Sequence, residues 1–125
     1  MKREDISRKP LKLLGAKGED EVARYLQAKG IKVIDRNWRI KGGELDLICE
    51  DHGVIVFVEV KTRTSNMYGT PFDAITPDKA FRLQRLALAW MAMHHRWGQD
   101  YRIDAAGVWM DGFGAIEIEH RKAVL

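Results

Sequence analysis

Three charged side chains in a largely apolar predicted hairpin are the residues whose types and spacing could do chemistry. Glu59 follows Asp46 after twelve intervening residues, and Lys61 stands two positions after Glu59. Carboxylates among apolar residues cost free energy unless a counter-charge, a hydrogen bond or a metal ion pairs with them. Two carboxylates can hold a hard divalent cation such as Mg²⁺, and a neighbouring ammonium suits a phosphate bound beside that cation.

The register of the predicted hairpin places these three charges on one face. With a two-residue turn at His52-Gly53, Asp46 faces Glu59 with Cβ atoms about 5 Å apart, and Lys61 points the same way. The other face is apolar, with Leu45 opposite Val60, Leu47 opposite Val58 and Cys49 opposite Val56. Like charges directly opposite each other are destabilising. The repulsion between Asp46 and Glu59 therefore requires a cation or a salt bridge.

A salt-bridged surface is the alternative explanation of this charged face. In it, Lys61 pairs with Glu44 and Glu59, an arrangement that is common and adds little stability. Glu19 argues against this alternative, because it lies beside the apolar stripe of a separate predicted helix and brings another carboxylate toward the sheet. A metal-free structural or partner-binding protein stays open as an interpretation.

The elements that must position these residues follow a mixed α/β pattern. They are helices over residues 11–29 and from 77 to Gly98, and strands over residues 31–40, 44–50, 54–62, 101–110 and 115–125. The order α-β-β-β-α-β-β predicts a single domain over residues 11–125, with a central mixed β-sheet flanked by helices. Residues 1–10 are expected to form a flexible N-terminal segment.

The second predicted helix has the clearest signals. Thr76 is the expected N-cap, and Pro77 occupies the first helical position. The apolar stripe predicted to face the core consists of Leu83, Leu86, Trp90, Met93 and Trp97. This spacing is typical of a helix packed on a sheet.

The composition indicates a globular protein and excludes several classes. Charged residues make up 31% of the 125-residue chain and hydrophobic residues 46%, a balance unlike that of disordered proteins. The net charge of +3 slightly favours an acidic partner such as nucleic acid. Cys49 is the single cysteine, so the chain can form no internal disulfide and no cysteine-based zinc site. We expect a cytoplasmic protein with no membrane partner, since neither a signal peptide nor an apolar span of about 20 residues is visible.

The histidines and Asp104 are expected to have structural roles. Asp104 lies in the strand after the long helix, where Arg102 is a suitable partner. His94, His95 and His120 have no partners at metal-ligand spacing, so we expect them to be structural or to face solvent.

The spacing from Asp46 to Glu59-Val60-Lys61 resembles the D-(12)-E-x-K core of the restriction-endonuclease-like, or PD-(D/E)xK, nuclease fold. It is similar to the spacing of archaeal Holliday junction resolvases. Four stretches make the resemblance more specific: "GAKGEDEVARYL" (15–26), "DRNWR" (35–39), "GELDLI" (43–48) and "FVEVKTR" (57–63). Together they resemble the YraN-like family of small uncharacterised proteins over about residues 12 to 120. Leu45 stands where the nuclease signature has proline.

The resemblance implies a role for each matching residue. Asp46 and Glu59 would bind Mg²⁺ or Mn²⁺ together with the carbonyl of Val60. Lys61 would orient the attacking water or help to deprotonate it, and Glu19 would hold a water on the metal or a second ion. These catalytic residues would belong to an endonuclease that hydrolyses phosphodiester bonds of DNA, branched or structured DNA included.

Basic residues around the hairpin are candidates for binding a phosphate backbone, of DNA more than of RNA. They are Arg36, Arg39, Lys41, Arg63, Lys79, Arg82 and Arg85, with Gln84 as a further contact from the long helix. A solvated charged face is the alternative explanation. A non-catalytic nucleic-acid-binding module on the same fold would use this surface without the carboxylates. A resolvase would need a homodimer, and the sequence leaves the oligomeric state open.

Overall fold

The structure is a computed structural model that describes the backbone of residues 8–65, 67 and 69–125, and the side chains of these residues from 14 onward. The expected flexibility of residues 1–7 lies outside the described residues. The elements are α1 (Arg8–Ala28), β1 (Lys32–Ile40), β2 (Gly43–Asp51), β3 (Val54–Arg63), the 3-10 helix η1 (Pro71–Ala74), α2 (Pro77–Met93), β4 (Tyr101–Met110) and β5 (Ile116–Arg121). The predicted element order and the mixed α/β class are confirmed. Helix α1 begins at Arg8, earlier than predicted, so the last residues of the segment expected to be flexible are helical.

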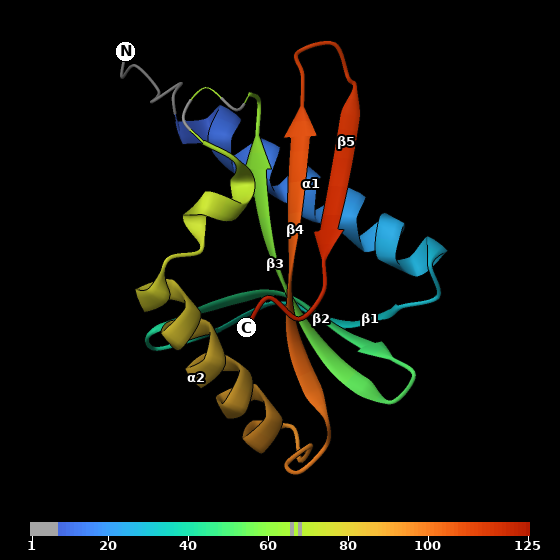
Figure 1. The fold of residues 1–125 in the computed structure, drawn as a ribbon, viewed down its shortest axis with the longest axis vertical. Coiled ribbons are helices and arrows are strands. Elements are labelled where there is room, and N and C mark those ends of the chain that lie inside the picture. The colour runs from blue at the N-terminus through green and yellow to red at the C-terminus, as the bar shows by residue number, and fades with distance from the viewer. Residues whose placement is uncertain (1–7, 66, 68) are drawn as a thin grey trace, which may run out of the picture.

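The strands form one five-stranded sheet in the order β1-β2-β3-β4-β5. Strands β3 and β4 are parallel, whereas the other neighbours are antiparallel. A parallel pair needs a long crossover connection, which η1 and α2 supply between β3 and β4. In Figure 1, α1 crosses behind β3, β4 and β5, and α2 lies at the lower left beside the β1–β2 hairpin. Because the two helices pack against different cores of buried strand residues, the sheet is the middle of three layers.

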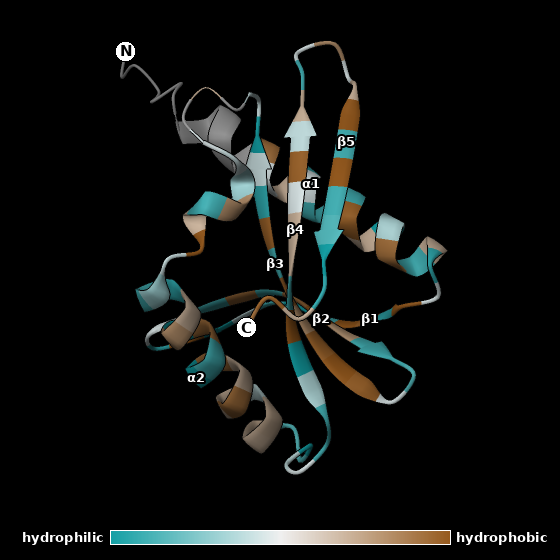
Figure 2. Cartoon of the chain, in the orientation of Figure 1, coloured by the Kyte–Doolittle hydropathy of each residue, from teal (hydrophilic) through white to brown (hydrophobic). Residues whose placement is uncertain are grey.

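Each face of the sheet has its own apolar core. On the α1 side, Val22 and Leu26 pack with Val58 and other strand residues. On the α2 side, Leu86 and Trp90 pack with strand residues that include Phe57. Burying such side chains stabilises the fold by about 1.5–3 kcal/mol each. Helix α2 accordingly alternates between brown and teal segments in Figure 2, since only one of its sides is buried.

The predicted hairpin register is confirmed from the turn up to the pair Leu47–Val58. The predicted contact of Leu45 with Val60 on one apolar face is wrong, because Leu45 belongs to the α2-side core and Val60 to the α1-side core. The alternation of β2 is interrupted between Leu45 and Leu47, which belong to different cores, and its pairing with β3 extends only as far as Leu47. Asn37, opposite Asp46 in the register, has a left-handed φ of 51°.

Helix α2 starts as predicted and ends early. The Thr76 side chain accepts a hydrogen bond from the Lys79 amide at 3.3 Å, which confirms the N-cap. The helix ends at Met93 instead of reaching Gly98. Met93 and Trp97 are 61% and 71% exposed, so their assignment to the core stripe is wrong. Trp90 completes the core, because its indole N–H donates to Asp35 at 3.0 Å and its ring packs against Phe57.

Helix α1 approaches β3 closely at one glycine. Gly18 is buried, and a Cβ built there would lie 2.1 Å from Oγ1 of Thr62. This contact sets the height of Glu19, the next residue of the helix, above the sheet. Within the described part of the chain, no helix has both the length and the apolar composition to cross a membrane.

We predict that Gly18→Ala lowers the free energy of unfolding by about 1–3 kcal/mol, the usual cost of overpacking. Gly15→Ala is the matched control in the same helix, because a Cβ there meets nothing within 4 Å. That variant should gain about 0.5–1 kcal/mol from the helix preference of alanine. Urea unfolding of both variants measures the difference. Thr62→Ala should rescue Gly18→Ala, and equal stability of the two glycine variants would contradict the close approach.

Candidate metal centre

Three carboxylates from two elements meet beside the sheet. Glu19 comes from α1, and Glu44 and Asp46 come from β2. Each offers an oxygen atom that lies within 4.8 Å of the others, and all three residues are half-buried. Oxygen ligands without nitrogen or sulfur favour hard cations such as Mg²⁺ and Mn²⁺. The donor set therefore fits the cation expected from the sequence.

Asp46 is fixed between β2 and β3. Its Oδ2 accepts a hydrogen bond of 2.8 Å from the Val60 amide. Burial, followed by the charge of Glu59, raises the pKa of Asp46 to about 8, although the Val60 hydrogen bond acts in the opposite direction. Glu19 raises this pKa further. The site thus holds Asp46 where its ionised form is unfavourable without a compensating positive charge.

Neighbouring groups also act on the pKa of Glu19 in opposite directions. Burial and then the charge of Glu44 raise its pKa, whereas Arg36 and a hydrogen bond with Asn37 lower it. Arg36 itself pairs with Asp20 at 2.5 Å. The arginine on the rim therefore only partly offsets the repulsion among the carboxylates.

Glu59 lies on the α2 side of the centre and has a different partner. Its Oε1 is 2.7 Å from Nζ of Lys79, and its side chain is only 9% exposed. Glu59 is close enough to Asp46 to raise the pKa of that residue, yet it is not one of the three clustered carboxylates. Lys79, expected as a phosphate contact, here neutralises Glu59.

A cavity of about 290 Å³ is lined by Glu44, Asp46 and Glu59 and also by Lys61, whereas Glu19 is not part of its lining. Its charged lining consists of Glu44, Asp46, Glu59, Lys61, Lys79 and Arg82. The expected salt bridges of Lys61 are not formed, since Glu59 pairs with Lys79 and Glu44 pairs with Arg39. Among the residues that the structure describes, none forms an ion pair with Lys61. This arrangement weakens the interpretation of the face as a salt-bridged surface.

The other predicted binding residues are distributed around the cavity. Arg82 lines it, whereas Arg85 lines a neighbouring groove along α2. Arg63 donates a hydrogen bond to the Thr62 carbonyl at 3.3 Å and lies at the end of β3. Gln84 is exposed and is not part of the cavity lining.

Glu44 is the acidic residue that the sequence interpretation left out of the site. The sequence places it opposite Lys61, as a salt-bridge partner in the alternative explanation only. Its position two residues before Asp46 was a usable signal, since residues at this spacing in a strand share a face.

We predict that the wild-type protein loses stability as pH rises between about 4 and 8. The pKa of Asp46 is raised from 3.8 to about 8 in the folded protein, so the unfolded chain binds fewer protons across this range. Asp46→Asn should flatten the dependence and be more stable than the wild type at pH 8, because its amide is neutral and can still accept the Val60 hydrogen bond. A gain of about 1 kcal/mol would raise Tm by roughly 4 °C.

Urea unfolding at several pH values, without divalent cations, tests this prediction. Glu50→Gln is the control, because it makes the same charge change on β2 outside the cluster. A variant Asp46→Asn that is less stable than the wild type at pH 8 would contradict the assigned electrostatics.

Comparison of the sequence with known proteins identifies the family of this chain. The model of "Uncharacterised protein family UPF0102" matches residues 18–108. A UPF0102 protein of Beutenbergia cavernae is 45% identical over 89% of this chain and 94% of its own length. UPF0102 proteins of an Arthrobacter species and of Nocardia farcinica are 43% and 45% identical, over 90% and 89% of this chain and 95% and 87% of their own lengths. The resemblance to the YraN-like proteins is thereby confirmed, and the chain belongs to the UPF0102 family.

Proposed function

We propose that this protein is a metal-dependent nuclease that hydrolyses phosphodiester bonds of DNA. One observation carries the proposal: Asp46 and Glu59 line the same cavity as Lys61, a lysine that forms no ion pair with any residue the structure describes. A purely structural charge cluster would be expected to use Lys61 to neutralise one of the carboxylates. Here Glu59 pairs with Lys79 and Glu44 pairs with Arg39, whereas Asp46 keeps a raised pKa. Lys61 is left for a ligand.

The residues that would hold the cation follow from the donor set. Asp46 is the ligand shared by two sets: Glu59 and the Val60 carbonyl would complete the set expected from the sequence, and Glu19 and Glu44, clustered with Asp46, would supply further oxygen atoms. When bound, Mg²⁺ or Mn²⁺ would offset negative charge that develops on the phosphate and lower the pKa of a water molecule. The raised pKa of Asp46, to about 8, supports this role, since an added cation relieves the same repulsion.

Lys61 and Lys79 would have different roles toward the substrate. Lys61 would contact the phosphate and orient the attacking water, because it lines the cavity and has no ion-pair partner in the described part of the chain. Lys79 holds Glu59 at 2.7 Å, and a bound phosphate would offer Lys79 a second acceptor. Arg82, one turn after Lys79 in α2, would add positive charge for the phosphate backbone of DNA where it leaves the cavity.

A non-catalytic nucleic-acid-binding module is the second candidate function. It is favoured by the position of Arg82 and Arg85, which face the cavity and the groove beside it. Such a module would bind DNA without metal, with an affinity that falls steeply with salt because phosphate contacts release counterions. DNA as the substrate, branched DNA included, a cytoplasmic location and a homodimer remain predictions from the sequence.

The nuclease proposal predicts metal-dependent cleavage of labelled DNA. The substrates are linear, nicked, flapped and four-way-junction DNA, each with Mn²⁺ and with EDTA. We expect cleavage of at least one substrate with Mn²⁺ only, and loss of that activity in Asp46→Asn. Survival of every substrate at high protein concentration, or cleavage by Asp46→Asn at the wild-type rate, would reject the proposal. Binding in EDTA that weakens with salt would then favour the non-catalytic module.

Lys61→Ala separates the catalytic role from a structural one. We predict loss of cleavage with unchanged or tighter Mn²⁺ binding, because a positive charge beside the cation has gone. The melting temperature should stay near that of the wild type, since no ion pair is broken among the described residues. Calorimetry with Mn²⁺ and thermal unfolding measure both quantities. Lys32→Ala, an exposed lysine of β1, is the control, and joint loss of metal binding and fold stability would contradict the role of Lys61.

A further inference from the structure

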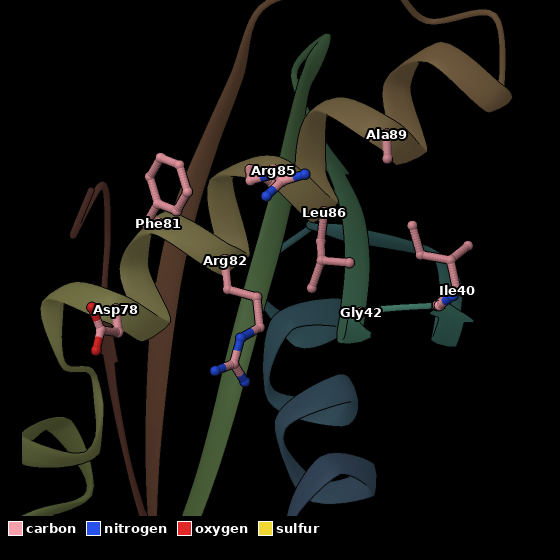
Figure 3. A pocket seen from close by; sticks show the side chains of 9 residues that line it. Ile40, Gly42, Asp78, Phe81, Arg82, Arg85, Leu86 and Ala89 are labelled. Atoms are coloured by element: carbon pink, nitrogen blue, oxygen red, sulfur yellow. The ribbon is translucent and has the colours of Figure 1, made fainter.

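A groove larger than the carboxylate cavity runs between α2 and the turn that joins β1 to β2. Its volume is about 510 Å³, against about 290 Å³ for the carboxylate cavity. Its lining from α2 is Asp78, Phe81, Arg82, Arg85, Leu86 and Ala89, and its lining from the turn is Ile40, Lys41 and Gly42. Figure 3 shows Arg82 and Leu86 projecting from α2 on the side of Ile40 and Gly42.

Phe81 is an exposed aromatic side chain in this groove. It is 64% exposed and belongs to neither apolar core. The guanidinium of Arg85 lies 5.9 Å from the centroid of its ring. The spacing of four residues along the helix brings these two side chains together. An aromatic ring with an adjacent guanidinium is a surface suited to stacking on a flat, electron-rich group.

The charge and the polarity of the groove indicate what it could bind. Lys41, Arg82 and Arg85 outnumber the single acidic residue, Asp78. Its apolar part comes from Ile40, Leu86 and Ala89. An anionic ligand with a flat apolar portion matches this combination, and a nucleotide has both features. In a duplex the faces of the bases are stacked on each other, so only an unpaired base can present a face to Phe81.

The groove is continuous with the proposed metal centre. Arg82 lines both the groove and the carboxylate cavity. Gly43 permits this closeness, since a Cβ at this position would lie 2.8 Å from Leu86 and 3.5 Å from the Arg82 side chain. A nucleotide in the groove would therefore lie next to a phosphate in the cavity, with Arg82 between them.

We propose that this groove binds an unpaired nucleotide of the substrate, with its base stacked on Phe81 and its phosphate held by Arg82 and Arg85. The inference rests on the proposed nuclease function and narrows its substrate class. The preferred DNA carries a single-stranded segment, such as an overhang or a flap, next to the phosphate that is cleaved. A fully paired blunt duplex offers no base to this site.

Fluorescence anisotropy in EDTA tests the binding site without cleavage. The probes are a labelled single strand, a duplex with a single-stranded overhang and the matching blunt duplex. We expect the wild type to prefer the first two probes. Phe81→Ala should weaken binding to them by about five-fold or more, the loss typical of one base–aromatic stack, and should change blunt-duplex binding by much less. Phe81→Trp should retain the preference.

Phe113→Ala is the matched control, because Phe113 is 100% exposed at the turn between β4 and β5, away from the groove. It should bind all probes as the wild type does. A fluorescent base analogue in the overhang should be quenched by the wild type and by Phe81→Trp, and not by Phe81→Ala. Equal effects of Phe81→Ala on single-stranded and blunt probes would overturn the proposal. So would conversion of a dimer to a monomer by Phe81→Ala in sedimentation velocity, since Phe81 would then cover a second copy of the chain.

The outcomes separate this inference from the nuclease proposal. A preference for single-stranded probes that depends on Phe81, without cleavage of any substrate, would support the groove and reject the nuclease. Cleavage with Mn²⁺ by a protein that has no such preference would support the nuclease and reject the groove. Asp46→Asn should keep the preference for unpaired DNA, because it leaves the groove unchanged.

Discussion

The hydrogen bond from the Val60 amide to the Asp46 carboxylate, 2.8 Å long, is the interaction on which the candidate centre depends. The regular pairing of β2 with β3 ends at Leu47 and Val58. Beyond this point a side chain of β2 satisfies the β3 amide, which would otherwise cost free energy as a buried unsatisfied donor. The same bond holds Asp46 beside Glu59 despite their repulsion. The fold thus uses a backbone requirement to keep two carboxylates together.

The charges around Asp46 are balanced by residues from other elements. Lys79 of α2 neutralises Glu59, and Arg39 of β1 pairs with Glu44. The raised pKa of Asp46 shows that this balance is incomplete. The stability that the protein loses at such a site must be compensated by favourable interactions elsewhere in the fold. The apolar cores on both faces of the sheet supply it, together with a buried network in which Asp104 accepts hydrogen bonds from Arg102 and His120 at 3.0 and 2.8 Å.

The sequence predicted what depends on local pattern and failed where distant elements decide. The Leu47–Val58 register and the Thr76 N-cap follow from alternation and capping, and both are confirmed. The face of Leu45 depends on the break in the β2–β3 pairing beyond Leu47 and Val58, which no alternation pattern shows. The stripe of α2 was extended to Trp97, although the helix ends at Met93, where the chain turns toward β4. The structural role expected for Asp104 is supported by its buried partners.

The candidate site shows the same division between local and distant information. The closeness of Asp46 and Glu59 could be predicted, because both lie in one hairpin, although the predicted pairing itself ends at Leu47 and Val58. The sequence could not predict which lysine pairs with Glu59. Lys61 lies only two residues away in β3, but the partner is Lys79, which belongs to α2 after the crossover. That choice has a chemical consequence. Because α2 brings Lys79 to Glu59, the ammonium of Lys61 is left facing the cavity. Because the same helix carries Arg82, Arg85 and Phe81, its placement also sets where these side chains line the cavity and the adjoining groove.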